Sequence, residues 1–188
     1  GARFAVAAAE QHAGVLAGVA LHPNEVPGLA AAGELTSAYA EIERLAAHPR
    51  VSVVGETGLD YFRTGLDGVP VQQESFRWHI DLAKRLGKAL QVHDRDSHDD
   101  VVRILDEEGA PPATVMHCFS GDDRFARECL EQISAVPVEE RNLLTSEKFA
   151  GPIAEPGKGG HDTAAIITAD PLGLGSDGYG RVTADSNF

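Results

Sequence analysis

The sequence predicts an α/β fold in which helices cover a parallel β-sheet. Through residue 132, short apolar runs alternate strictly with longer segments whose apolar residues recur every three or four positions. Continuous apolar runs are typical of strands that are buried on both faces. The longer periodic segments are typical of helices that pack on such a sheet. A barrel and an open doubly wound sheet both satisfy this pattern.

The first three elements are predicted to be a helix, a strand and a helix. Residues 2–12 combine apolar positions with several alanines, which favours a helix. The apolar run 15–21 indicates a buried strand that ends at His22. In residues 34–47 the apolar side chains form one stripe at three- and four-residue steps, which predicts an amphipathic helix.

The same alternation continues through the next six elements. We expect strands and helices in turn at residues 51–54, 72–86, 89–92, 97–108, 114–116 and 122–132. The strand that begins at residue 51 should stop at Gly55–Glu56, and the one that begins at residue 89 should end at His93. After residue 133 the pattern decays into a glycine-rich segment, to which we assign no elements.

Composition and charge narrow the class of protein. The 188 residues include 29 acidic and 16 basic side chains, and the net charge of −13 works against simple electrostatic attraction to nucleic acid or to an anionic membrane. The 43% hydrophobic and 24% charged content is that of a globular protein, so we expect residues 1–188 to form a single domain. Two cysteines, no signal-peptide pattern and no apolar stretch of about 20 residues favour a cytoplasmic protein without a membrane span.

Four successive predicted strands end at a residue that can bind a metal ion: His22, Glu56, His93 and His117. The carboxyl ends of parallel strands share one face of an α/β protein, so these side chains are expected to converge there. Imidazole nitrogens and carboxylate oxygens are the ligands of catalytic divalent ions. A single histidine is more often a hydrogen-bonded core residue, but four such residues at equivalent places favour a metal site.

Arg95 and the two cysteines are interpreted separately from the four candidate metal ligands. Arg95, which follows His93 by two positions, is suited to bind a phosphate through two parallel hydrogen bonds. Its alternative is a surface ion pair with a neighbouring aspartate. Cys118 should point to the opposite side of its strand from His117 and be buried, and Cys129 lies on the apolar stripe of a helix.

Four segments form one ordered set of motifs: Ala20–Glu25 (ALHPNE), Val54–Tyr61 (VGETGLDY), Gln91–Arg95 (QVHDR) and Met116–Gly121 (MHCFSG). Together they resemble a known family, the TatD metal-dependent deoxyribonucleases, and its actinobacterial type most of all. The resemblance covers about residues 4–130 and holds in order and spacing. It implies a TIM-like (β/α) barrel that cleaves phosphodiester bonds in DNA with metal-activated water, using one or two divalent ions (Mg, Mn or Zn) per chain.

The resemblance also implies roles for individual residues. Glu56, His93 and His117 match the metal ligands of the family motifs, and in a complete two-metal site Glu56 would bridge both ions. Glu56 and Arg95 would then be the catalytic residues, with Arg95 offsetting negative charge on the phosphate. His22 and Arg95 match rim positions that would face the DNA substrate. No obligate protein partner is expected.

The sequence departs from the family pattern at both ends, so we expect an incomplete barrel. No H-x-H pair of the family's first strand occurs, and the late E-T-D-x-P motif is absent. The nearest counterpart of that motif places Glu147 where the family has aspartate. A complete barrel takes about 250 residues, so residues 1–132 are family-like and residues 133–188 are divergent. The general base is left open among Glu147, Asp170 and Asp177.

Three other functional readings stay open at this point. A barrel of this type also fits a metal amidohydrolase that acts on a small ester or amide. The missing first strand fits a catalytically inactive, metal-binding fragment of the family. In the third reading the histidines are structural and no metal binds.

Overall fold

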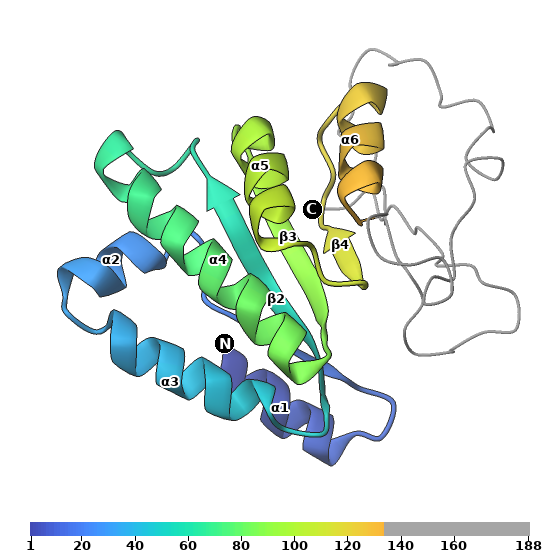
Figure 1. The fold of residues 1–188 in the computed structure, drawn as a ribbon. Helices are drawn as coiled ribbons and strands as arrows, with labels where there is room; N and C mark the ends of the chain where they lie inside the picture. Colours follow the sequence, from blue (N-terminus) through green and yellow to red (C-terminus); the bar gives the residue numbers. More distant parts are fainter. Residues whose placement is uncertain (134–188) are drawn as a thin grey trace, which may run out of the picture.

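A computed structural model describes residues 1–133 of the chain and contains a four-stranded sheet with helices packed on it (Figure 1). The strands are β1 (Ala17–Val19), β2 (Val51–Asp60), β3 (Ala89–Arg95) and β4 (Thr114–Met116). The helices are α1 (Ala2–Gln11), α2 (Val26–Ala31), α3 (Leu35–Ala46), η1 (Leu66–Gly68, a 3₁₀ turn), α4 (Val69–Leu86), α5 (His98–Glu108) and α6 (Asp123–Ile133). Each strand and helix predicted in residues 1–133 is present. Glu147, Asp170 and Asp177 lie outside the described residues.

The order of the strands decides between the two sheet types that the sequence left open. All four strands are parallel, and their order in the sheet is the order in the chain, β1-β2-β3-β4. A doubly wound sheet reverses its strand order at a switch point. The sheet in residues 1–133 has no such reversal, and its consecutive winding is that of a (β/α) barrel. These four strands are half of the eight in a complete barrel, which agrees with the incomplete barrel predicted from the sequence.

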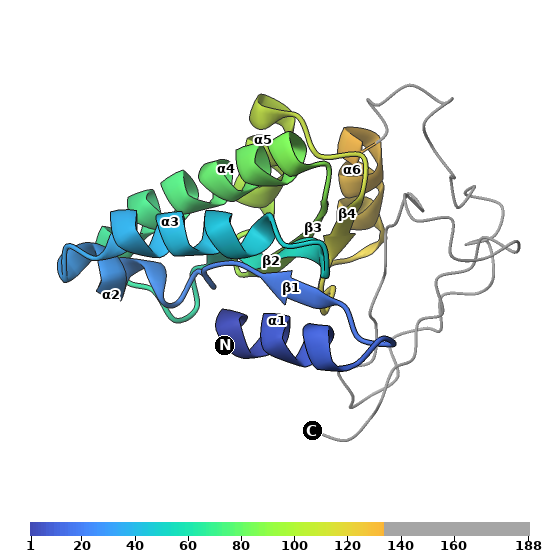
Figure 2. The same ribbon diagram turned by 90° about the horizontal axis from the view of Figure 1, so that it is seen from below.

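Helices α3, α4 and α5 pack on one face of the sheet, and α6 packs beside α5 (Figure 1). Helix α4 contacts β2 and β3 through a stripe that includes Phe76, Ile80 and Ala83, all with no exposed surface. The three- and four-residue spacing of this stripe is the helical period that the sequence displays. Helix α1 packs against β1 on the side away from α4 (Figure 2). A large part of the core therefore lies between the sheet and α4.

Three predicted strand ends were wrong, because β1 ends at Val19, before His22, whereas β2 and β3 continue past Glu56 and His93. The two strands pair through Gly58–His93, Leu59–Asp94 and Asp60–Arg95. The apolar runs stop at Gly55–Glu56 and at His93, whereas the ladder is formed by backbone groups, which pair whether the side chains are polar or apolar. The two outer strands do end close to Glu56 and His93. Strand β1 pairs with β2 only as far as Val54, and β4 pairs with β3 only as far as Val92.

The short helix α2 was not predicted from the sequence. It has six residues and begins with a proline in its first turn, which is too short for an apolar period to emerge. In the part of the chain that the structure describes, no helix is both long and apolar enough to cross a membrane.

Candidate metal centre

The Glu56 side chain contacts two imidazoles that come from other segments of the chain. Its Oε1 atom accepts a hydrogen bond from His93 Nδ1 at 2.9 Å and a second one from His117 Nδ1 at 3.0 Å. Glu56 lies in β2, His93 lies in β3, and His117 directly follows β4. The structure therefore brings together the three residues that the sequence selected as metal ligands.

Two glycines allow the strands at this place to approach closely. A Cβ atom on Gly58 would lie 2.1 Å from the carbonyl oxygen of His93, and one on Gly55 would lie 2.4 Å from Cβ of Gln91. Gly58 also has a φ of +135°, which side chains disfavour. The register of the β2–β3 ladder shifts between Val54 and Thr57, so that the strand is irregular where it carries Glu56. The glycines of this motif therefore serve strand contact at the site.

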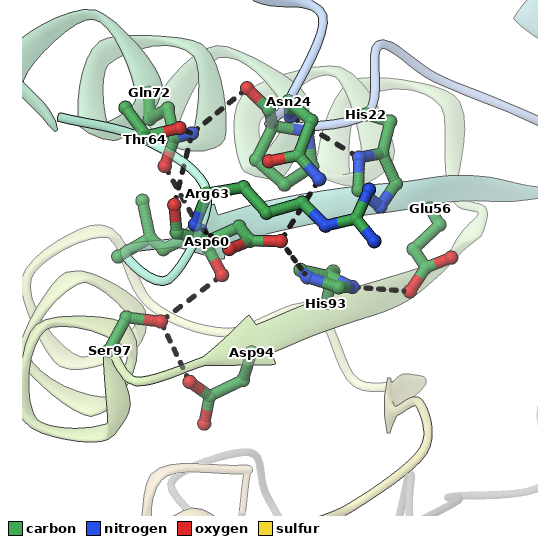
Figure 3. A network of polar contacts seen from close by, with 12 residues as sticks. His22, Asn24, Glu56, Asp60, Arg63, Thr64, Gln72, His93, Asp94 and Ser97 are labelled. Carbon is green, nitrogen blue, oxygen red and sulfur yellow. Dashed lines mark hydrogen bonds and ion pairs between the residues drawn. The ribbon is translucent and has the colours of Figure 1, made fainter. Parts of the chain in front are cut away.

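His22 completes a cluster with Glu56 and His93. One ligand atom from each of the three residues lies within 4.8 Å of the other two. The His22 and His93 rings meet edge to face, with centroids 4.6 Å apart, and Figure 3 shows both imidazoles beside the Glu56 carboxylate. His117 is not part of this cluster, although it contacts the same Glu56 oxygen. Glu56 therefore belongs both to the cluster with His22 and His93 and to the contact with His117.

Asp60 is a functional candidate that the sequence analysis missed. Its side chain is 1% exposed, and its Oδ2 atom accepts hydrogen bonds from His93 Nε2 (3.1 Å) and Asn24 Nδ2 (3.0 Å), as Figure 3 shows. Its Oδ1 atom accepts a bond from the backbone N–H of Arg63 at 2.9 Å. A predicted strand that extended to residue 60 would have revealed Asp60, because side chains four positions apart in a strand point to the same face, and Asp60 would then lie on the face of Glu56.

Gln72 joins the loop after β1 to the end of β2. Its Oε1 atom accepts a hydrogen bond from the backbone N–H of Asp60, and its Nε2 atom donates to the carbonyl oxygen of Pro23, both at 3.0 Å. The Gln72 side chain comes from α4 and is completely buried. Because the amide satisfies buried backbone groups on both segments, it fixes the His22 loop against the strand that carries Glu56.

The charges at the site are set by burial and by these contacts. Burial alone would raise the pKa of Glu56, but the hydrogen bonds from His93 and His117 outweigh it and lower the pKa to about 2. Burial alone would lower the pKa of His93, but the carboxylates of Glu56 and Asp60 outweigh it and raise the pKa. Burial, together with the nearby charge of His93, lowers the pKa of His22. Near neutral pH, Glu56 is therefore ionised and His22 is uncharged.

Arg95 lies at the rim with its guanidinium over the ring of Phe62, 3.9 Å from the ring centroid. Among the described residues it forms no ion pair, and the neighbouring Asp94 bonds instead to Ser97 Oγ (2.7 Å) and His98 Nδ1 (2.5 Å). The surface ion pair considered from the sequence is therefore not formed in this part of the chain.

The prediction of a buried Cys118 was wrong, whereas Cys129 is buried as its place on the apolar helix stripe indicated. Strand β4 ends at Met116, and Cys118 has a φ of +47°, so the alternation of an extended strand no longer applies to it. Its thiol is exposed, with Sγ 3.6 Å from His117 Nε2. Burial raises the pKa of the Cys129 thiol to about 12.

Comparison with known proteins places the chain in one family. The family model described as TatD related DNase matches residues 2–141, which is most of the chain. The chain belongs to this family.

Relatives and solved structures agree with this assignment. Over 134 residues the chain is 50% identical to an "uncharacterized metal-dependent hydrolase TatD" of Mycobacterium tuberculosis, covering 69% of this chain and 49% of that protein. It is 35% identical over 128 residues to a "3'-5' ssDNA/RNA exonuclease TatD" of Cronobacter turicensis, covering 67% and 46%. The crystal structure of YJJV, a TatD homologue of Escherichia coli, superposes with a TM-score of 0.55 at 27% identity, covering 69% and 49%. The chain thus spans about half the length of these proteins.

Proposed function

We propose that this chain is part of a metal-dependent hydrolase that cleaves phosphodiester bonds in DNA. The observation that carries the proposal is the Glu56 carboxylate held between imidazoles from two other segments, at the carboxyl edge of a parallel sheet. The similarity to the Cronobacter protein, which is named as a single-stranded DNA and RNA exonuclease, supports the choice of a nucleic-acid substrate. The exposed free thiol of Cys118 supports a reducing compartment such as the cytoplasm.

The residues at the site fit a divalent ion. Two ligands of one ion, each about 2.1 Å from it, lie roughly 3.0 to 3.4 Å apart at octahedral to tetrahedral angles. The nitrogen–oxygen separations of 2.9 and 3.0 Å at Glu56 need little or no opening to reach this range. Mixed imidazole and carboxylate donors suit Zn²⁺ and Mn²⁺ and are compatible with Mg²⁺. We therefore propose Glu56, His93 and His117 as ligands of one or two such ions.

The remaining rim residues would bind the phosphate. A bound ion would supply Lewis-acid polarisation of the phosphodiester and a water of lowered pKa. The guanidinium of Arg95, supported by the ring of Phe62, would neutralise a phosphate oxygen. His22, uncharged and beside Glu56, would donate a hydrogen bond to the substrate. The net charge of −13 does not oppose this role, because a bound ion and Arg95 would make the site locally more positive than the outer surface.

Hydrolysis of a labelled DNA strand, with Mg²⁺, Mn²⁺ or Zn²⁺ added back after chelation, tests the proposal. The unaltered chain should cleave only with an ion present, and Glu56→Gln should abolish cleavage while leaving the unfolding transition in place. Glu41→Gln is the matched control, because Glu41 pairs with Arg3 and Arg44 on the surface. Ion binding without cleavage would favour an inactive fragment, and turnover of small esters or amides in place of DNA would favour an amidohydrolase. Cleavage by Glu56→Gln at the unaltered rate would refute the proposed site.

A further inference from the structure

We propose that Asp60 and Asn24 give the two adjacent imidazoles of the site different chemical roles. Asp60 makes His93 an ion ligand through Nδ1, and the backbone of Asn24 makes His22 a hydrogen-bond donor through Nε2. The inference rests on the proposed ion site and adds two positioning residues to it. It also predicts which nitrogen of His93 binds the ion and which nitrogen of His22 donates to the substrate.

The role of His93 follows from what a carboxylate can do. A carboxylate oxygen only accepts hydrogen bonds, so the Nε2 atom that lies 3.1 Å from Asp60 Oδ2 carries a hydrogen. Without an ion, Nδ1 also carries a hydrogen, which it donates to Glu56 Oε1. An imidazole that binds an ion is neutral and has one N–H group. Because Glu56 is proposed to bind the same ion, the hydrogen that remains is the one bonded to Asp60, and the lone pair is on Nδ1. That atom lies 2.9 Å from Glu56 Oε1. Asp60 therefore directs the lone pair of His93 toward the carboxylate that shares the ion.

The role of His22 follows from the opposite contact. A backbone N–H only donates, and that of Asn24 lies 3.3 Å from Nδ1 of His22. Nδ1 must then hold the lone pair, and the single hydrogen of the neutral ring is on Nε2. A nitrogen that carries a hydrogen is not an ion ligand, but it donates well to a phosphate oxygen or a water. His22 therefore belongs to the substrate side, although it clusters with Glu56 and His93.

Asn24 connects the two assignments. Its backbone N–H faces His22, and its Nδ2 atom donates to Asp60 Oδ2, the same oxygen that accepts from His93. The orientation of this amide is fixed, because reversing it would set Oδ1 against a carboxylate. Asn24 Oδ1 is buried and has no hydrogen-bond partner in residues 1–133. This unpaired oxygen indicates that the amide is held for its donor contact with Asp60.

The test uses Cd²⁺ as the probe and reads the nitrogens directly. In the full chain labelled with ¹⁵N-histidine and loaded with ¹¹³Cd²⁺, we expect ¹¹³Cd coupling to Nδ1 of His93 and an N–H signal at its Nε2. His22 should give an N–H signal at Nε2 and no coupling to cadmium. Coupling to Nε2 of His93, or to either nitrogen of His22, would overturn the inference while leaving the proposed ion site intact. Absence of any cadmium binding would overturn both.

A variant tests the positioning role separately. Asp60→Ala should weaken Cd²⁺ binding, measured by calorimetry, roughly ten- to a hundred-fold, the usual effect of losing a carboxylate that orients a ligating histidine. It should also split the His93 signal between two ring nitrogens. Asp94→Ala is the matched control, since Asp94 is a nearly buried carboxylate next to His93 in β3 that bonds to Ser97 and His98 instead of to the imidazole. Equal Cd²⁺ affinities of Asp60→Ala and Asp94→Ala would contradict the role of Asp60. If Asp60→Ala does not fold, the cadmium couplings of the unaltered chain test the inference by themselves.

Discussion

Protonation of the buried His79 should destabilise the fold as pH falls from 6.5 toward 4. His79 has no exposed surface; its Nε2 accepts a hydrogen bond from the backbone N–H of Leu21 at 3.1 Å, and its Nδ1 donates to the carbonyl oxygen of Ser75 at 2.7 Å. Burial lowers the pKa of His79 from 6.5 to about 4. The unfolded chain therefore takes up a proton in this range while the folded chain does not, so the free energy of unfolding declines as the solution becomes more acidic.

The size of this effect follows from the two pKa values. A pKa lowered from 6.5 to about 4 corresponds to about 2.5 kcal/mol of unfolding free energy lost between pH 7.5 and 4.5. Urea denaturation of the unaltered chain and of His79→Gln at several pH values measures it, because groups common to both proteins cancel in the difference. The advantage of the unaltered chain should shrink by about 2 to 3 kcal/mol over this range. A difference that is independent of pH would refute the reasoning.

Three further predictions follow from the geometry of the site. Gly58→Ala should lower the free energy of unfolding by more than about 2 kcal/mol, because the added Cβ would collide with β3, and it should also weaken ion binding. Thermal denaturation measures the loss of stability. Gly28→Ala is the control, since a Cβ at Gly28 would have no neighbour within 4 Å. Arg95→Ala should weaken binding of a single-stranded oligonucleotide and reduce the slope of log affinity against log salt by about 0.7, whereas the surface change Arg44→Ala should alter both less. In the folded chain Cys118 should react with Ellman's reagent and the buried second cysteine should not; two reactive thiols before unfolding would contradict the described burial.

The sequence predicted the elements of the fold because their signals are local. An apolar run buried on both faces and an amphipathic period are each readable in one segment, and β4 and α4 lie where those signals place them. Glu56, His93 and His117 could be selected for a related reason, since each marks the end of an apolar run, and parallel strands bring such ends to one edge.

The parts that could not be predicted depend on contacts between distant segments. Asp60 lies in a polar stretch whose strand character comes from pairing with β3, and its contact with His93 spans 33 positions. The hydrogen bond from Asn24 to Asp60 depends on a loop held by Gln72 from α4. The exposure of Cys118 depends on a backbone angle of one residue. Neither composition nor periodicity carries such information.

The most direct test of the account is the position of an ion in crystals of this chain soaked with Mn²⁺ or Zn²⁺ and located by anomalous scattering. We expect the ion within about 2.2 Å of a Glu56 carboxylate oxygen, bound to the Nδ1 atom of His93 or of His117. An ion found away from Glu56, or none at that carboxylate at saturating concentration, would contradict the proposed metal centre.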